Sequence, residues 1–162
     1  MKGLVYAIFA TDENMGFGLN NSLPWNNKDD LKHFRAVTSG HVLIMGRRTW
    51  ESVPQHKVTQ NRTCIVITSG VEKLSHGAIK AISLEDAIDA VQGRICFLIG
   101  GKRVIEDALD KQLVDCVLWS KIKGVFESDV KLKKENDLLK HLSLQTTTFY
   151  DNFTIFTFVR GD

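Results

Sequence analysis

The chain has 162 residues, of which 43% are hydrophobic and 25% are charged. A chain of this size and composition is long enough for one hydrophobic core, so we expect a single domain over residues 1–162. Its formal net charge is +2, from 21 basic and 19 acidic side chains mixed along the sequence. This balance argues against a nucleic-acid-binding or membrane-coating protein, whereas a small anionic ligand is compatible with it.

The rest of the composition favours a soluble cytoplasmic protein, which we expect to be a monomer. No run approaches the roughly 18 apolar residues that predict a membrane-spanning helix. The first residues, MKGLVYAIFATDE, are more typical of a strand than of a signal peptide. The three cysteines and five histidines are too widely spaced for a disulfide framework or a metal site. We therefore expect reduced thiols and no bound metal.

Apolar, β-branched runs alternate with helical or turn-like segments, which predicts an α/β fold. The runs are nearly continuous in apolar residues, so the predicted sheet is mainly parallel and is covered by about four helices. The strands expected in this part are residues 4–10, 42–45, 64–68, 78–82, 95–99 and 116–119. Residues 142–149 and 153–160 predict an antiparallel carboxy-terminal hairpin that brings the sheet to about eight strands.

Helix signals are clearest where a capping residue precedes an apolar repeat. Ser83 and Asp86 form a near capping box for a helix over residues 83–91, which Gly93 ends. A second helix is expected to begin after an N-cap at Asn27 and to run towards Gly40.

Asp30 is the first candidate for a functional residue. At 100° per residue it shares a helix face with Phe34 and Val37, whereas Asp29 points to the opposite side. A carboxylate on an apolar face is costly unless it has a partner, which favours a ligand-binding or proton-handling group. Both acids would also suit the positive amino terminus of a helix, so spacing alone leaves the two interpretations open.

Two strand ends lead through glycine into a helix, a pattern suited to binding an anion. In residues 42–54 a strand leads through Gly46 into Arg47 and Arg48, and in residues 95–109 a strand leads through Gly100 and Gly101. Backbone N–H groups at a helix start and nearby guanidinium groups bind phosphate oxygens. Surface charge alone explains the arginines equally well, and neither unit contains GxGxxG or GxxxxGK[ST], which disfavours a standard dinucleotide or P-loop fold.

A third strand end carries two hydroxyl side chains. Thr68 and Ser69 close the run RTCIVITSG and would suit a ribose 2′-phosphate, although turn formation explains them equally well.

Taken in order, these motifs resemble the dihydrofolate reductase family over essentially the whole chain. They are GFG at 16–18, LPW at 23–25, the helix with Asp30 and Phe34, MGRRTWES at 45–52, ITS at 67–69 and IGGKRV at 99–104. The resemblance implies a dihydrofolate reductase-like fold and the NADPH-dependent reduction of 7,8-dihydrofolate to 5,6,7,8-tetrahydrofolate. Hydride would reach C6, N5 would be protonated, and the product would serve one-carbon metabolism and thymidylate synthesis.

The same resemblance implies roles for individual residues around the pterin. Asp30 holds the 2-amino group and N3, Ser120 hydrogen-bonds this acid where a threonine is usual, and Trp25 orders a water nearby. Arg62 matches the arginine that binds the α-carboxylate of the substrate's glutamate tail. The implied substrate-binding residues are Ile8, Phe9, Leu31, Phe34, Val53, Arg62 and Ile99.

A second implied set surrounds NADPH. Arg47 and Arg103 are expected to favour NADPH over NADH. Gly100-Gly101 resembles an unusual cis Gly-Gly bond, and residues 14–23 resemble a mobile loop that closes over the nicotinamide with support from Asp129. The implied cofactor-binding residues are Ala10, Phe17, Gly18, Leu23, Gly46, Arg47, Arg48, Thr49, Thr68, Ser69, Gly100, Gly101, Lys102, Arg103, Val104 and Ile105.

Two departures from the family pattern bear on efficiency. Ile105 stands where a tyrosine near the nicotinamide is common, which predicts slower turnover. Thr59-Gln60-Asn61 replaces a Leu-Pro-Gly type turn before Arg62, which puts the benzoyl-glutamate pocket and antifolate affinity in question. Two alternatives remain: a reductase of the same fold acting on a riboflavin-pathway pyrimidine, which should lack Asp30 and Ser120, and a non-catalytic protein, which Ile105 would suit.

Overall fold

Eight strands form one mixed sheet, and two further strands form a small second sheet. The computed structural model describes residues 3–19 and 23–161 of the chain. The strands are β1 (Val5–Thr11), β2 (Gly16–Gly18), β3 (Val42–Gly46), β4 (Thr63–Ile67), β5 (Ile79–Ala81), β6 (Cys96–Gly100), β7 (Cys116–Ile122), β8 (Val130–Lys131), β9 (Leu142–Phe149) and β10 (Phe153–Arg160). The helices are α1 (Lys28–Thr38), α2 (Arg47–Ser52), α3 (Gln55–Val58), α4 (Leu84–Ala90), α5 (Lys102–Asp110) and α6 (Glu135–Leu138).

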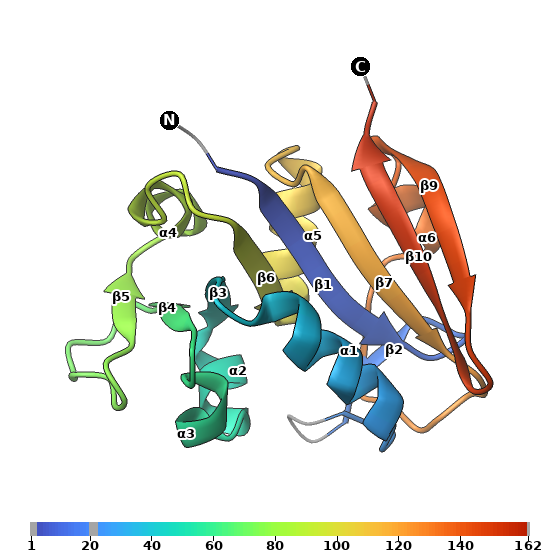
Figure 1. Ribbon diagram of the computed structural model, residues 1–162, viewed down its shortest axis with the longest axis horizontal. Coiled ribbons are helices and arrows are strands. Elements are labelled where there is room, and N and C mark those ends of the chain that lie inside the picture. The colour runs from blue at the N-terminus through green and yellow to red at the C-terminus, as the bar shows by residue number, and fades with distance from the viewer. Residues whose placement is uncertain (1–2, 20–22, 162) are drawn as a thin grey trace.

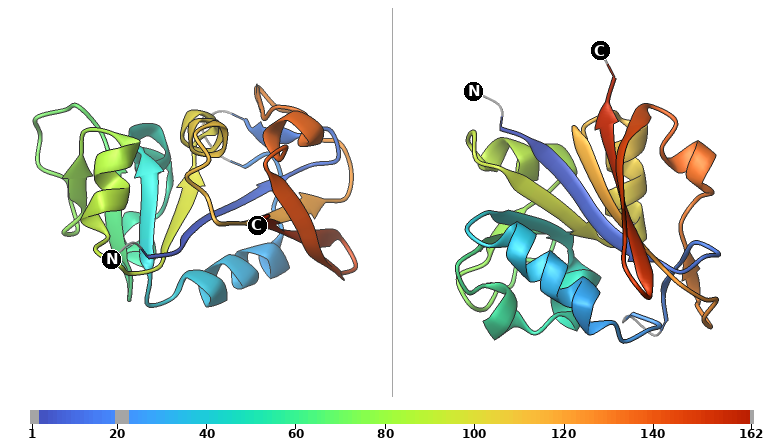
Figure 2. Two further views of the ribbon diagram at one scale, coloured as in Figure 1. Left: turned by 90° about the horizontal axis from the view of Figure 1, so that it is seen from above. Right: turned by 45° about the vertical axis from the view of Figure 1, so that its right-hand side comes forward.

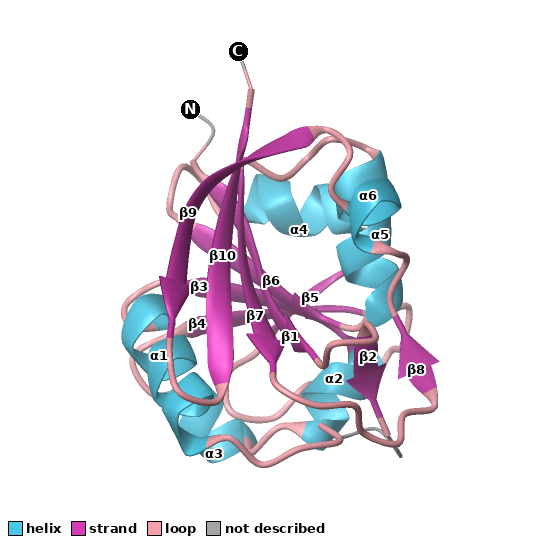
Figure 3. Ribbon diagram, turned by 90° about the vertical axis from the view of Figure 1, so that its right-hand side faces the viewer, coloured by secondary structure: helices cyan, strands magenta, loops and turns pink. Residues whose placement is uncertain are grey.

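The large sheet has the order β5-β4-β3-β6-β1-β7-β10-β9 (Figures 1 and 3). The six strands from β5 to β7 are parallel to their neighbours, and β10 runs antiparallel between β7 and β9. The predicted α/β fold with a mostly parallel sheet and an antiparallel carboxy-terminal hairpin is therefore confirmed. The hairpin strands have the predicted bounds, and the amide of Tyr150 donates to the carbonyl of Phe153 across the turn.

Helices cover both faces of the sheet, as two separate clusters of buried side chains indicate. One cluster joins the sheet to α4, α5 and α6 through residues such as Ala87, Ala108 and Leu138. The other joins it to α2 and α3 through Trp50 and Val58, with α1 packed against the same cluster. Figure 2 shows the blue helix α1 on one side of the sheet and the yellow α5 on the other. Burial on both faces explains why the central strands are nearly continuous apolar runs.

The capping predictions are confirmed by hydrogen bonds. The side chain of Asn27 accepts from the amide of Asp30 at the start of α1, and Ser83 accepts from the amide of Asp86 at the start of α4. The strands β2 and β8 and the helices α3 and α6 were not predicted. Each has two to four residues, which is too short for an apolar periodicity to emerge.

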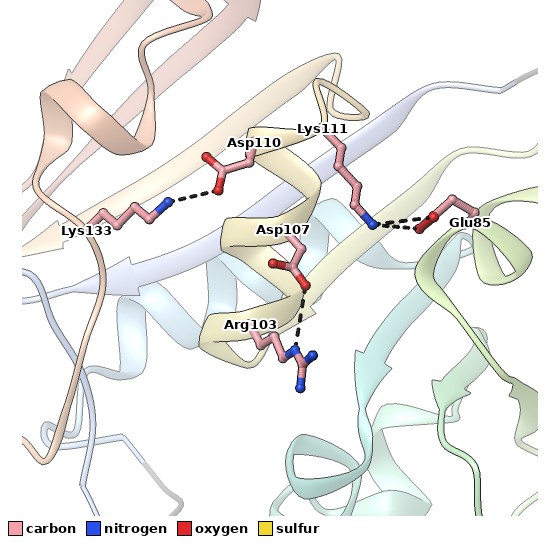
Figure 4. A network of polar contacts seen from close by, with 6 residues as sticks. All are labelled: Glu85, Arg103, Asp107, Asp110, Lys111 and Lys133. Atoms are coloured by element: carbon pink, nitrogen blue, oxygen red, sulfur yellow. Dashed lines mark hydrogen bonds and ion pairs between the residues drawn. The ribbon is translucent and has the colours of Figure 1, made fainter.

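Ion pairs fix the exposed side of α5 to its neighbours (Figure 4). Lys111 contacts Glu85 at the start of α4, 3.4 Å away, and Asp110 contacts Lys133, 2.9 Å away in the segment before α6. The buried Glu106 of the same helix accepts from the amide of Lys133 at 2.7 Å. These contacts hold α5 against the sheet. Because α5 follows β6 directly, they also hold the end of that strand.

Within the described residues, no helix has the length and apolar character needed to cross a bilayer. The same residues contain no group of three or more histidine, cysteine and acidic side chains placed to bind a metal ion.

Candidate active site

Asp30 lies on the side of α1 that faces the sheet. Burial raises the pKa of the Asp30 carboxyl, while a hydrogen bond with the Ser120 side chain and the nearby His33 lower it, and the net result is a raised pKa. Ser120 is itself buried on β7. Asp30 and Ser120 thus lie close together, and the raised pKa means that the acid holds its proton to higher pH than an exposed aspartate would.

Trp25 lies next to Ser120 in this region and carries a buried polar atom, the indole Nε1. Its side chain is only 8% exposed and packs in a cluster with Ile155 and Ala10, both of which pair with Ser120 in the sheet. The indole Nε1 is buried and has no hydrogen-bond partner among the described residues. Buried donors in proteins are almost always paired. This N–H group therefore suits a solvent or ligand oxygen next to the Asp30 and Ser120 pair.

Apolar side chains from four segments, among them the helix that carries Asp30, come together in one cluster. Ile8 from β1 lies in one buried cluster, against which Phe34, Val53 and Ile99 pack. Ile44 of β3 pairs with Leu98 and Met45 pairs with Gly100, so Ile99 is an extra residue in β6. Such a bulge changes the direction of a side chain, often beside a functional site.

Leu31 belongs to the same helix as Asp30 and is more open. Its side chain is 44% exposed. It therefore contributes an accessible apolar surface at the edge of this region.

Two predicted site residues, Phe9 and Ile105, pack in the cluster on the other face of the sheet, against which the predicted residues Phe17 and Val104 also pack. Phe9 follows Ile8 in β1, and because alternate side chains of a strand point to opposite faces, it packs in the α4 and α5 cluster. Ile105 is fully buried in that cluster on the inner side of α5. Their implied contacts with the substrate and the cofactor stay predictions.

Arg62 is held by three hydrogen bonds, two of them to residues of α1. Its Nε donates to Thr38 Oγ1 at 2.9 Å, its Nη1 to the carbonyl of Gln60 at 2.8 Å and its Nη2 to the carbonyl of Arg35 at 2.9 Å. These bonds tie the guanidinium to the end of α1, the helix that carries Asp30. A fixed guanidinium of this kind suits a carboxylate ligand.

The carboxyl ends of β4, β3 and β6 lie side by side, which brings the predicted cofactor residues into one row. Gly46 caps α2 and Gly101 caps α5, and neither helix has a side-chain cap. The first backbone N–H groups of both helices are thus available to an anion. A Cβ atom at Gly46 would lie 3.6 Å from Val104, so the two helix starts are also in contact.

Gly100 and Gly101 lie at the end of β6, and because they have no side chain they leave space beside these strand ends that a larger residue would fill. The peptide bond between them is cis, as the resemblance implies. Gly100 has φ 141°, and a Cβ atom there would lie 3.3 Å from Thr49 Oγ1 and 3.6 Å from the ring of Phe17. The predicted residues Thr49 and Phe17 therefore both border this glycine surface.

Basic and hydroxyl side chains surround the same row. Arg47 Nη1 donates to Thr68 Oγ1 at 3.4 Å, and the amide of Gly70 donates to the same oxygen at 3.1 Å. Ser69 is exposed between them. The other predicted cations here are also exposed: Arg48, Lys102 and Arg103.

The loop after β1 is tied to a distant segment through Asp12. The buried carboxylate of Asp12 accepts from the amides of Asn14, Gly16 and Phe126 at 2.8–2.9 Å. In addition, the amide of Asp129 donates to the carbonyl of Gly18. The predicted loop of residues 14–23 falls partly outside the described residues. Leu23, just after the gap, is exposed.

Three residues of this region are not in the predicted set of site residues. Tyr6 alternates with Ile8 along β1 and packs against the same cluster, so the period-two pattern of a strand would have identified it. Leu118 of β7 packs there too. His33 lies one turn after Asp30 on α1, and helical spacing would have found it.

Comparison with known proteins places the chain among reductases. The family model for dihydrofolate reductase matches residues 4–153. A dihydrofolate reductase of Bacillus subtilis is 38% identical over 127 residues, which cover 78% of this chain and 73% of the relative. One from Staphylococcus aureus is 36% identical over 122 residues, which cover 75% and 73%. A solved structure of the Enterococcus faecalis dihydrofolate reductase, complexed with NADP(H) and RAB-propyl, has a TM-score of 0.84 at 25% identity and covers 100% of this chain and 99% of that one.

Proposed function

Since the chain belongs to the dihydrofolate reductase family and is an NADPH-dependent enzyme of that activity, we propose that its reduction of 7,8-dihydrofolate depends on Asp30. The observation that carries this proposal is the position of Asp30, an acid with a raised pKa, paired with Ser120 and bordered by apolar side chains. A reductase of the same fold acting on a riboflavin-pathway pyrimidine is not expected to need this pair.

The carboxylate of Asp30 is suited to hold the pterin ring. Its two oxygens can accept from the 2-amino group and from N3 in a bidentate arrangement, which fixes both the position and the plane of the ring. The hydroxyl of Ser120 keeps the carboxylate in one orientation. With the ring held at this end, we expect C6 and N5 to face the glycine surface at the end of β6.

Protonation of N5 is aided by the same acid. Burial raises the pKa of Asp30, so the carboxyl is closer to exchanging a proton near neutral pH than an exposed acid would be. The unpartnered Nε1 of Trp25 can orient a solvent molecule beside it. The apolar surroundings from Ile8, Phe34 and Ile99 exclude bulk water from the reacting atoms.

The residues at the row of strand ends fit NADPH, which when bound supplies the hydride that reduces C6. The uncapped starts of α2 and α5 suit its pyrophosphate. Arg47 and Thr68, already in contact, suit the 2′-phosphate. The surface of Gly100 and Gly101 suits the close approach of a flat ring, since a Cβ atom there would crowd Thr49 and Phe17.

The tail of the substrate would lie along α1. Arg62, held by its contacts with Thr38 and the carbonyl of Arg35, is placed to bind the α-carboxylate of the glutamate. Because a fixed guanidinium loses little freedom when it binds, it can contribute affinity at a distance from the chemistry.

We further propose a cytoplasmic monomer with one domain, which would supply tetrahydrofolate for one-carbon metabolism and thymidylate synthesis. All of the site residues described above come from one chain. No disulfide joins the cysteines of the described residues. Sedimentation of the enzyme with and without NADPH would test the monomer, and a stable dimer would contradict it.

The experiment for the proposed function compares two neighbouring acids. Asp30→Asn should lower kcat/KM for dihydrofolate by at least about a hundredfold, since general acid–base assistance contributes on this order. Asp29→Asn, the exposed neighbour on the same helix, is the matched control and should leave the rate within about twofold of the wild type. Loss of NADPH absorbance with dihydrofolate is the measurement. Equal rates in the two variants would refute the role of Asp30.

A further inference from the structure

His33 carries the second of two buried nitrogen atoms that have no hydrogen-bond partner among the described residues; the other is Nε1 of Trp25. His33 lies three positions after Asp30 in α1, and residues at this spacing are neighbours on one helix face. The two unpartnered nitrogens therefore come from the two segments that border the Asp30 carboxyl, α1 itself and the turn before it.

A buried nitrogen without a hydrogen-bond partner is energetically unfavourable unless solvent or a ligand supplies the partner. Leaving such a group without a partner keeps the full cost of removing it from water. An apolar ring at position 33 would avoid that cost while filling the same space. The Nε2 atom of an imidazole can donate or accept, so it can take a partner supplied by solvent or by the substrate.

The electrostatic surroundings of this histidine are simple. Burial lowers the pKa of His33, and Asp30 opposes that effect. Asp30 is the charged group that acts on the imidazole from α1. On the side of the carboxyl, the polar groups that act on it are Ser120 from β7 and His33. The lowered pKa favours the neutral ring near pH 7, in which Nε2 can carry the proton and donate.

Resting on the function proposed above, we propose that His33 is a positioning residue for the pterin-binding acid. Its Nε2–H group donates, through a bound solvent molecule, to the Asp30 carboxylate on the side that Ser120 does not occupy. With one donor on each side, the carboxylate is held in the plane that the pterin requires. His33 does not touch the reacting atoms, and its effect passes through Asp30.

A donor that stabilises the ionised carboxylate also sets the pH range of the enzyme. Removing that donor makes the charged form of Asp30 less favourable, so its pKa rises further. Substrate binding that needs the carboxylate is then lost at a higher pH than in the wild type. A residue that only fills space would change stability without moving this pH dependence.

The test compares His33→Leu with His33→Gln, whose side-chain amide keeps a nitrogen donor near the position of Nε2. His33→Leu should raise KM for dihydrofolate about tenfold, change kcat by less than about threefold, and shift the acidic limb of the kcat/KM profile to higher pH by about half a unit or more. His33→Gln should restore most of the KM and the profile. His56→Leu, at an exposed histidine of α3, is the matched control and should change none of these values.

The outcomes separate this inference from the proposed function. If Asp30→Asn abolishes turnover but His33→Leu keeps the wild-type KM and pH profile, the positioning role is overturned and the proposed function stands. If wild-type enzyme does not oxidise NADPH with dihydrofolate, the proposed function itself fails.

A measurement on the folded full-length chain covers the case in which His33→Leu is unstable. The ¹⁵N chemical shift of His33 Nε2 should move when Asp30 is replaced by asparagine and should not move in Asp29→Asn. An unchanged shift in both variants would overturn the inference.

Discussion

The indole Nε1 of Trp119 donates a 2.9 Å hydrogen bond to Oγ1 of Thr11, and the two side chains are 1% and 0% exposed. The bond joins β7 to β1, 108 positions apart in the chain. Thr11 Oγ1 in turn donates to the carbonyl of Asp12. One hydroxyl thus connects the central strands to the loop that follows β1.

Thr11→Val should lower the free energy of unfolding by about 1–3 kcal/mol, because the valine has the same shape but leaves the indole N–H without a partner. Urea denaturation at pH 7 measures the loss. Thr148→Val on the exposed edge strand β9 is the matched control and should change stability by less than about 0.5 kcal/mol. A similar loss in both variants would contradict the role of the Trp119 bond.

Asp12→Asn should destabilise the protein at neutral pH, because an amide can satisfy at most two of the three backbone donors that meet at Asp12. We expect a loss of about 1–3 kcal/mol at pH 7. The same substitution should loosen the link to Phe126 and thereby raise KM for NADPH. Thermal unfolding and initial rates are the measurements, with the exposed Asp151→Asn as control.

The stability contributed by Asp12 should depend on pH. Burial acts to raise the pKa of Asp12, but the hydrogen bonds from Phe126, Gly16 and Asn14 outweigh it and leave a lowered pKa. A carboxyl whose pKa is lower in the folded state stabilises the fold above its unfolded pKa and loses this effect as the pH falls through the folded pKa. The stability gap between wild type and Asp12→Asn should therefore be constant near neutrality and shrink below about pH 4. A gap that widens in acid would refute this account.

Arg47→Gln should reduce the preference for NADPH over NADH. Arg47 reaches Thr68 at the end of the neighbouring strand, where a 2′-phosphate would complete the contact. We expect KM for NADPH to rise about tenfold or more while KM for NADH changes little, since a charge-assisted bond to phosphate is worth about 1.5–3 kcal/mol. Lys140→Gln, an exposed cation outside the site, controls for net charge. Equal changes with the two cofactors would show that Arg47 does not contact the 2′-phosphate.

Cys64 and Cys116 should be slow to react with alkylating reagents in the folded enzyme. Burial raises the pKa of each thiol to about 11, from an ordinary value of 9.0. The thiolate is the reactive form, so at pH 8 labelling should be about a hundredfold slower than in the unfolded chain. Mass spectrometry after iodoacetamide treatment, with and without denaturant, measures this. Rapid labelling of both thiols in the native enzyme would contradict the prediction.

The amino-acid sequence by itself determined the parts of this protein that depend on neighbouring residues. The capping of α1 by Asn27 and of α4 by Ser83, and the bounds of β9 and β10, follow from signals within a few positions of the chain. The order of the motifs was sufficient to indicate the family, which the matches over residues 4–153 bear out. Helical spacing places Asp30 on the apolar face but leaves its role open, and the resemblance to the family supplies that role.

Only the tertiary structure decided which face of the sheet each side chain meets and which distant groups become partners. The sequence alone did not reveal that Phe9 and Ile105 pack in the cluster on the other face of the sheet, because an apolar residue suits either face. It also did not reveal that the carboxylate of Asp12 binds the amide of Phe126, 114 positions away. Strand order and the packing of helices on two faces set these contacts, and neither leaves a local pattern in the chain. Only the tertiary structure likewise showed that Nε2 of His33 is buried without a hydrogen-bond partner among the described residues, since burial depends on everything that surrounds the atom.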